Sequence, residues 1–148
     1  KTLSLVGSRL TCRWSIALAA DDAGPLDVWF APELSLTLLA GNDPQRRYLV
    51  PGRTLAADEA RMASRGAFAA TRALELVCEW SRFGIALAAE GGENAPDIWR
   101  FPLETASQSE SGFERTYQGS VIAPVWPIQL IPGGQPFGCA LTLNVTEL

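Results

Sequence analysis

The sequence predicts an all-β domain built as an antiparallel sandwich or barrel. Stretches with an apolar residue at every second position recur along the chain, and this is the period of a half-buried strand. Clusters of Gly, Pro, Asn and Asp separate these stretches at regular intervals. No amphipathic helix of useful length, repeat or low-complexity linker interrupts them. We therefore expect roughly nine to eleven strands in a single domain that spans residues 1–148.

The first half of the chain alternates clearly in four places. We expect strands at 9–18, 26–30, 34–38 and 48–50, with turns at 21–25 and 41–44. The least regular segment, 53–67, is expected to be a loop with at most a turn or two of helix within 56–63. Glu33 interrupts an apolar strand, so we expect it to face solvent, or, if buried, to pair with Arg100 or Arg115.

The second half contains the longer strands. We expect them at 73–80, 85–89, 97–105, 113–131 and 138–145. The tight connection at 81–84 makes the first two a hairpin, and loops are expected at 91–96 and 132–136. Pro124 and Pro127 lie inside the longest strand and indicate an edge position or a bulge there.

Composition excludes several classes of partner. The 12 basic and 16 acidic residues give a net charge of −4, whereas binding to a phosphate backbone needs a basic stripe. No apolar run approaches the roughly 20 residues that span a bilayer, and the first residues lack a signal-peptide pattern. We expect neither nucleic acid nor membrane as a partner, and a cytoplasmic location. The chain begins with Lys1, which suggests a piece of a longer protein or a processed product.

The reactive side chains are few. Cys12, Cys78 and Cys139 lie far apart in apolar, strand-like segments, so we expect reduced, buried thiols rather than a zinc site. Histidine is absent, which excludes Ser-His-Asp and Cys-His catalysis and a His-based zinc site. We expect no cofactor and no metal.

The most informative stretch is PLETASQSESGFERTYQG at 102–119. It concentrates carboxylates, amides, hydroxyls and an arginine between two strand-like segments. Such groups either hydrogen-bond one another into a rigid surface loop, or present donors and acceptors to a polyhydroxylated ligand or a partner domain.

This stretch also carries a family resemblance. From the Phe101-Pro102 step through LETxSxSExGFExxYQG at 103–119, the second half resembles the C-terminal β-rich domain of glycoside hydrolase family 57 α-amylases and 4-α-glucanotransferases. WFAPELSLTLLAGNDPQRRYLV at 29–50 and LELVCEWSRFGIALAA at 74–89 resemble further parts of that domain.

The resemblance implies a large β-sandwich of the galactose mutarotase-like (supersandwich) type. It further implies a position beside a (β/α) barrel that performs retaining cleavage or transfer of α-1,4-glucans and carries the catalytic nucleophile and acid. That barrel has no counterpart in these residues. We therefore expect a non-catalytic accessory domain excised from a longer glucan-active enzyme, with no catalytic residue of its own. The alternative is a free-standing carbohydrate-binding or protein-interaction module.

The candidate site combines the polar stretch with one neighbouring aromatic residue. Its members are Trp99, Glu104, Ser107, Gln108, Glu110, Glu114, Arg115, Tyr117 and Gln118. Either they bind glucan, or they dock the sandwich onto the N-terminal barrel, and we favour docking because interfaces between domains are often polar. Independent glycosidase chemistry by Glu110 and Glu114 is disfavoured, because carboxylate pairs are common on polar loops and no apolar pocket that would raise a pKa is evident.

The tryptophans offer faces on which a sugar ring could stack. Trp14 and Trp80 align with apolar neighbours, so we expect both in the core. Trp99 is the best stacking candidate, although core packing is the stronger expectation. For Trp126, a place in the core and a place on an exposed platform are equally expected.

Overall fold

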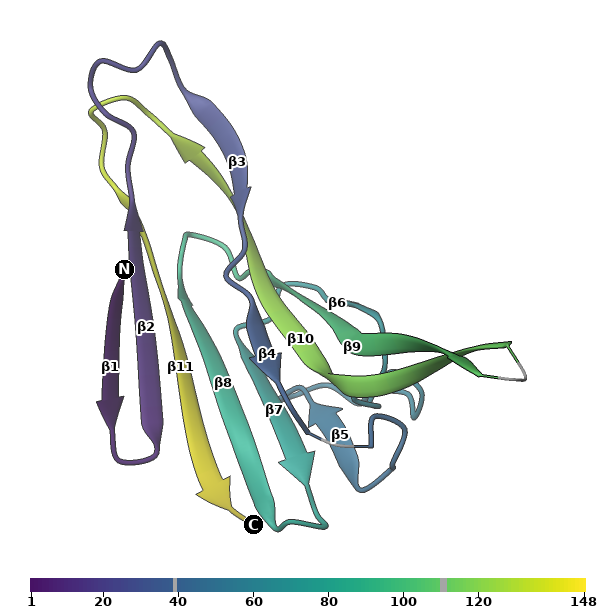
Figure 1. Ribbon diagram of the computed structural model, residues 1–148. Helices are drawn as coiled ribbons and strands as arrows, with labels where there is room; N and C mark the ends of the chain where they lie inside the picture. Colours follow the sequence, from purple (N-terminus) through teal and green to yellow (C-terminus); the bar gives the residue numbers. More distant parts are fainter. Residues whose placement is uncertain (39, 110–111) are drawn as a thin grey trace.

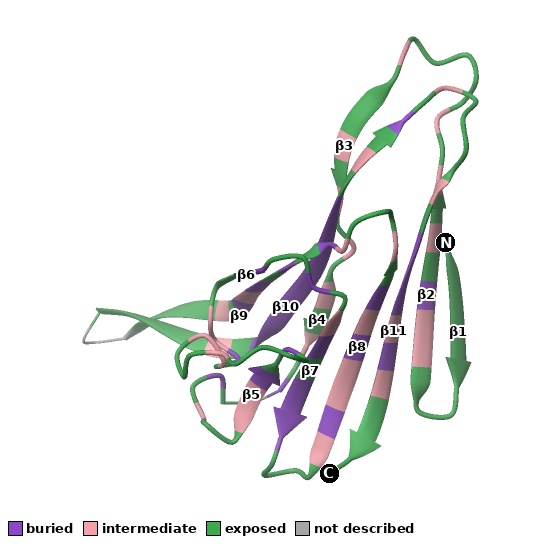
Figure 2. Cartoon of the chain, turned by 180° about the vertical axis from the view of Figure 1, so that it is seen from behind, coloured by how far each residue is buried: buried purple, intermediate pink, exposed green. Residues whose placement is uncertain are grey.

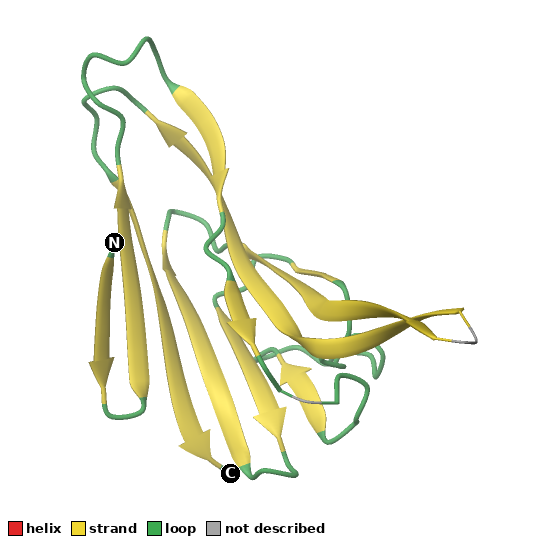
Figure 3. Ribbon diagram, viewed as in Figure 1, coloured by secondary structure: helices red, strands yellow, loops and turns green. Residues whose placement is uncertain are grey.

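The computed structural model describes residues 1–38, 40–109 and 112–148, and in these residues every regular element is a β-strand (Figures 1 and 3). The strands are β1 (Thr2–Val6), β2 (Arg9–Ile16), β3 (Leu26–Phe30), β4 (Leu34–Leu36), β5 (Arg46–Leu49), β6 (Gly66–Phe68), β7 (Ala73–Cys78), β8 (Phe83–Gly91), β9 (Asp97–Ser109), β10 (Gly112–Leu130) and β11 (Phe137–Glu147).

The strands form two antiparallel sheets. One has six strands in the order β1-β2-β11-β8-β7-β5, and the other has five, with β3-β10-β9-β6 in a row and β4 also paired to β10. The described strands pair antiparallel throughout. The predicted all-β antiparallel class is confirmed, and the two sheets make the molecule a sandwich.

The predicted hairpin of 73–80 and 85–89 is confirmed as β7 and β8, with Leu74 opposite Leu87. The chain's last strand, β11, lies between β2 and β8 and so joins the β1–β2 hairpin to the rest of the six-stranded sheet. Two short strands, β1 and β6, lie where no strand was expected. The irregular segment before β6 contains turns without a helix, as expected.

Pro124 lies where β10 is paired with β9 and so does not mark an edge, whereas Pro127 lies beyond the start of β9, where, of the described strands, β10 pairs with β3 alone and has one open edge, as expected. β3 and β4 pair with β10 in one continuous register, with Phe30 opposite Trp126 and Leu34 opposite Ile122. Pro32, between β3 and β4, therefore falls level with Pro124 of β10. Neither proline has a backbone N–H to donate, so the two sit together where the ladder is interrupted.

The core lies between the sheets and forms two apolar clusters. The larger contains Leu38, Tyr48, Val50, Met62, Phe68, Leu74, Leu76, Leu87, Ile98, Ile122 and Leu143. The smaller contains Ala89, Trp126, Cys139 and Leu141, with Trp14, Phe30 and Phe137 packed against it. All three cysteines are buried free thiols, as predicted. Figure 2 shows that burial concentrates in the middle of the sandwich and on the adjoining part of β10.

Two expectations about tryptophan were wrong and one open case is settled. Trp80 is 74% exposed, because β7 ends at Cys78 and the alternation does not extend into the following turn. Trp99 is 40% exposed, because the opposite face of β9, with Ile98 and Arg100, is the face that packs inward. Trp126 is a core residue at 2% exposure.

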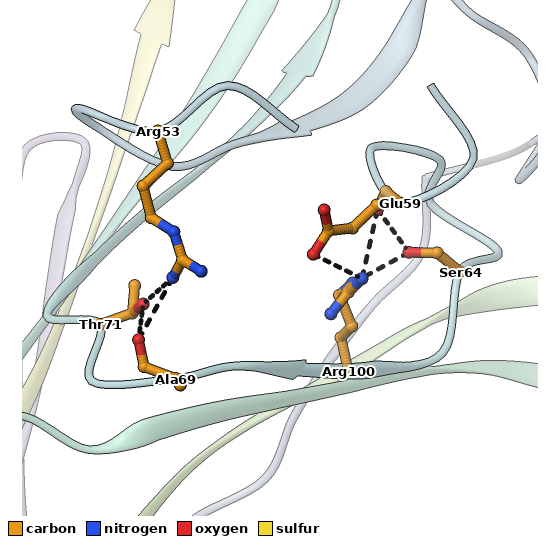
Figure 4. Close-up of polar contacts among 6 residues, drawn as sticks. All are labelled: Arg53, Glu59, Ser64, Ala69, Thr71 and Arg100. Carbon is orange, nitrogen blue, oxygen red and sulfur yellow. Dashed lines mark hydrogen bonds and ion pairs between the residues drawn. The ribbon is translucent and has the colours of Figure 1, made fainter. Parts of the chain in front are cut away.

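Two arginines fix the long segment between β5 and β7: Arg53 joins its two ends, and Arg100 of β9 fastens it to the body (Figure 4). Arg53 donates to the carbonyl oxygen of Ala69 and to the hydroxyl of Thr71, each over 3.2 Å. Arg100 is only 3% exposed and donates from Nε to Ser64 Oγ over 2.9 Å. Its acidic neighbour is Glu59, with 3.7 Å between Nη2 and Oε1, whereas Glu33 is exposed.

No described segment forms a helix long and apolar enough to cross a membrane.

Candidate functional site

The polar stretch is the outer part of a long hairpin, and the strands expected at 97–105 and 113–131 extend further into it than predicted. β9 continues to Ser109 and β10 begins at Gly112, so the two strands pair across the whole motif. The described residues at 105–108 and 112–116 are all exposed, and this end of the hairpin extends away from the sandwich (Figures 1 and 2). We call residues 103–118 the ribbon.

A β-bulge lies where the ribbon leaves the sandwich. Tyr117 pairs with Glu104 and Gly119 pairs with Leu103, so Gln118 is an extra residue on β10. Such a bulge bends the strand and increases its twist. The Gln118 side chain donates from Nε2 to Thr105 Oγ1 of the facing strand over 3.2 Å, which ties the two strands together at this point.

Tyr117 anchors the base of the ribbon. Its hydroxyl lies 2.7 Å from Ser120 Oγ, and Ser120 donates to the carbonyl oxygen of Met62 over 2.8 Å. The ring packs directly on Gly41, where a Cβ atom would come within 2.6 Å of Tyr117 Cδ2. Burial raises the pKa of Tyr117, against the opposing effect of the Ser120 hydrogen bond. Tyr117 therefore acts as a structural residue.

Glu104 is the centre of an ion-pair cluster. It accepts from Arg65 Nη2 over 2.5 Å and lies 3.8 Å from Arg115 Nη1. Arg65 belongs to the loop before β6, so this cluster links the ribbon to the body. Because Arg65 and Arg115 are largely exposed, solvent screens the pairs and each contributes at most about 1 kcal/mol.

The remaining candidates of the ribbon point outward. Glu114 lies opposite Ser107, and Phe113 lies opposite Gln108. All four are exposed, and Phe113 reaches 83%. Glu110 lies outside the described residues. Glu104 is ion-paired and Glu114 is exposed, so neither sits in the enclosed apolar pocket that keeps a catalytic acid protonated.

Trp99 does not join the ribbon. It lies opposite Ala123, five residues from Glu104 along β9, a spacing of about 17 Å in an extended strand. There it meets Trp29 of β3 edge-on, with 5.8 Å between ring centroids and 78° between ring planes. The two tryptophans line a cleft of about 660 Å³.

Trp29, one of the five tryptophans with a face that could stack on a sugar, is not among the predicted site residues, although the alternation of β3 indicates its exposure. It falls between Val28 and Phe30, on the face of β3 that also carries Asp27. It is 69% exposed. An aromatic residue on the polar phase of a strand is a marker of an exposed aromatic surface.

Among the described residues, no group of three or more Cys, Asp or Glu side chains could hold a metal ion.

Comparison with known proteins gives a match over most of the chain. The family model for the C-terminal domain of alpha-amylase/4-alpha-glucanotransferase matches residues 1–135. Alpha-amylase 1 of Dictyoglomus thermophilum is 32% identical over 111 residues, which are 74% of this chain and 14% of the amylase. The chain therefore spans about a seventh of the length of this curated relative.

Two solved structures share the fold. A putative aldose 1-epimerase from Escherichia coli K12 superposes with a TM-score of 0.70 at 16% identity, over 99% of this chain and 59% of that one. The 4-alpha-glucanotransferase from Thermococcus litoralis superposes with a TM-score of 0.57 at 17% identity, over 99% of this chain and 18% of that one. The epimerase match confirms the predicted galactose mutarotase-like sandwich.

Proposed function

The chain belongs to the family of C-terminal domains of alpha-amylases and 4-alpha-glucanotransferases, and from this premise we propose that it is a non-catalytic accessory domain of an enzyme of glycoside hydrolase family 57. We propose that it docks through the ribbon onto the N-terminal catalytic barrel of its parent chain. The substrate of the parent is proposed to be an α-1,4-glucan.

The observation that carries the docking proposal is that the ribbon is exposed on both faces. An isolated two-stranded hairpin is only marginally stable in water, yet this one extends for several residues beyond the last strand that flanks it. Its described residues are mostly polar or charged, and its two large exposed apolar residues are Leu103 at the base and Phe113 near the tip. A mainly polar surface with few large apolar residues suits an interface between domains, which is more polar than a permanent subunit interface.

The same geometry argues against glucan binding at the ribbon. Ligand sites are concave and are lined by apolar and aromatic groups, whereas the ribbon presents its side chains on two open faces. Tyr117, the ring nearest its base, is half-buried against Gly41. Docking is therefore the better supported of the two alternatives for these residues.

Hydrogen–deuterium exchange tests the proposal in the full-length parent protein. The amides of residues 103–118 are compared in the parent and in this chain alone. Docking predicts at least about tenfold slower exchange in the parent, because an interface removes the outward amides from water. In the parent, Phe113→Ser is expected to restore fast exchange, and Trp80→Ser, a change at a similarly exposed aromatic residue, is the matched control.

Equal exchange rates in the parent and in the isolated chain would refute the docking proposal. In that case the ribbon would face water or an independent partner even in the parent protein.

A further inference from the structure

We infer that the cleft lined by Trp29 and Trp99 is a carbohydrate-binding site that takes a short segment of α-1,4-glucan. The assignment as a carbohydrate site stands on the geometry of the cleft. The choice of glucan rests on the proposed function.

The cleft is built by β3, β9 and β10, together with the loop at 92–95 and with Gln135 and Phe137 at the start of β11. β10 runs between β3 and β9, with Pro127 opposite Trp29 and Ala123 opposite Trp99. Odd-numbered residues of β10 share the outer face of this sheet, so both indoles stand on that face and flank the strand. Between them β10 contributes the small side chain of Val125, which is 5% exposed. The two rings meet edge to face across β10, with 5.8 Å between their centroids, and so form one continuous aromatic surface along the cleft.

Both indoles remain partly exposed, although they contact each other. Trp29 is 69% and Trp99 is 40% exposed, whereas Trp126 on the inner face is 2% exposed and donates from Nε1 to Gly91 O over 3.2 Å. Leaving an indole in water forgoes about 1.5–3 kcal/mol of burial for each large apolar side chain. Exposed tryptophans that meet at a cleft are therefore typical of a surface that binds something.

Polar groups surround the indoles at positions that are already fixed. Asp97 Oδ1 accepts from the backbone N–H of Ala70 over 2.9 Å, and Gln129 Nε2 donates to Asp27 Oδ1 over 3.0 Å. These bonds hold the carboxylate of Asp97 and the amide of Gln129 in place at the cleft wall. Arg72 braces the far wall, the loop of Glu93 and Asn94, by donating to the carbonyl oxygens of residues 91–93 over 3.1–3.5 Å.

The chemistry of this lining fits a neutral sugar. The apolar C–H face of a pyranose ring stacks on an indole, and the hydroxyls at its rim donate to carboxylates and exchange hydrogen bonds with amides. Asp97, Glu93, Asn94 and Gln129 supply those groups. No Lys or Arg occurs among the described lining residues, so the cleft has no group to neutralise a phosphate or an acidic peptide. Its volume of about 660 Å³ lies in the roughly 300–1,000 Å³ range of ligand sites.

The angle between the rings favours a curved glucan over a flat one. Each α-1,4 linkage turns a glucose unit relative to the preceding one, so the chain coils, whereas a β-1,4 chain is extended and flat. Coplanar rings would suit the flat chain. The ring planes of Trp29 and Trp99 are inclined by 78°, and such a corner can contact two successive units of a coiled chain.

Binding of maltoheptaose to this chain, measured by isothermal titration calorimetry, tests the inference. The wild type should bind, and Trp29→Ala and Trp99→Ala should each weaken binding by at least about tenfold, the equivalent of losing about 1.4 kcal/mol of buried contact. Trp80→Ala is the matched control, since Trp80 is 74% exposed and lies outside the cleft; its affinity should equal that of the wild type. Unchanged thermal unfolding of Trp29→Ala confirms that its loss of binding is local.

Three results would overturn the inference. If the wild type did not bind maltoheptaose at millimolar concentration, the cleft would not be a glucan site. If Trp29→Ala and Trp99→Ala bound as tightly as the wild type, the binding site would lie elsewhere. Binding of cellohexaose in preference to maltoheptaose would refute the α-glucan assignment and the substrate class of the proposed function. None of these results changes the exchange rates of the ribbon, so a failure of the sugar site and a failure of the docking proposal are distinguishable.

Discussion

Replacement of the buried Arg100 by methionine is expected to be nearly neutral, whereas replacement by alanine is expected to destabilise the domain strongly. Arg100 lies on the inward face of β9, with its guanidinium carbon 3.8 Å from the centroid of the Phe68 ring. Its Nη1 has no hydrogen-bond partner among the described residues. Burial lowers the pKa of Arg100, with the charge of Glu59 opposing that effect.

The magnitude follows from what each substitution removes. Both lose the charged hydrogen bond to Ser64, about 1.5–3 kcal/mol, and the contact over Phe68, about 2 kcal/mol. Both also remove the desolvation cost of the guanidinium, several kcal/mol. Ser64 keeps its own 2.8 Å bond to the Glu59 carbonyl oxygen, so no new buried polar group is left unpaired. Methionine preserves the volume, and its net effect should stay within about 1 kcal/mol, whereas alanine adds the cavity cost of about 2–5 kcal/mol.

Urea unfolding followed by tryptophan fluorescence measures both variants against the wild type. We expect the wild type and Arg100→Met to have similar free energies of unfolding, and that of Arg100→Ala to be at least about 2 kcal/mol lower. If the two variants lost the same free energy of unfolding, the charge rather than the volume of Arg100 would stabilise this part of the core, and the reasoning would be wrong.

Two further substitutions test the close packing and the ionisation of the core. Gly91→Ala should cost at least about 3 kcal/mol, because its φ is +104° and its Cβ would lie 2.3 Å from Gly138 O; Gly138→Ala, where nothing lies within 4 Å of the new Cβ, is the control in thermal unfolding. Burial raises the pKa of Tyr48 from 10.0 to about 12, so the folded state favours the neutral phenol. The free energy of unfolding should therefore fall by about 3 kcal/mol as pH rises from about 10 to 12. Tyr48→Phe should flatten the decline of unfolding free energy over that range, and an unchanged decline would contradict this assignment.

The strands that have one buried face could be predicted from the sequence, because burial on one side places an apolar residue at every second position. The β7–β8 hairpin and β11 followed from that period directly. The outer ribbon has no such period, since it is exposed on both faces. The expected strands therefore stop at 105 and resume at 113, whereas in the structure residues 106–108 also pair with β10. Backbone hydrogen bonds pair the two strands of the ribbon, and these bonds leave no pattern in the order of the side chains.

The alternation of residues along a strand does not show which of its two faces packs against the core. β9 carries apolar residues on both phases, and Trp99 was assigned to the core although Ile98 lies on the inner face. The candidate site was limited in the same way. Residues adjacent in sequence were grouped together, whereas the structure joins Trp99 to Trp29, 70 positions away, and Glu104 to Arg65 of another loop.

β10 connects the two regions of interest as one uninterrupted strand. Phe113 lies at its ribbon end and Pro127, opposite Trp29, at its other end. Fourteen residues of extended chain span no more than about 50 Å, and the middle of the strand is buried in the sandwich. Under the two proposals, β10 fixes the spacing between the sugar site and the docking surface. It holds a captured glucan at a set distance from the docked barrel, so the polysaccharide stays tethered near the catalytic domain while its free segments search for the active site at a raised local concentration.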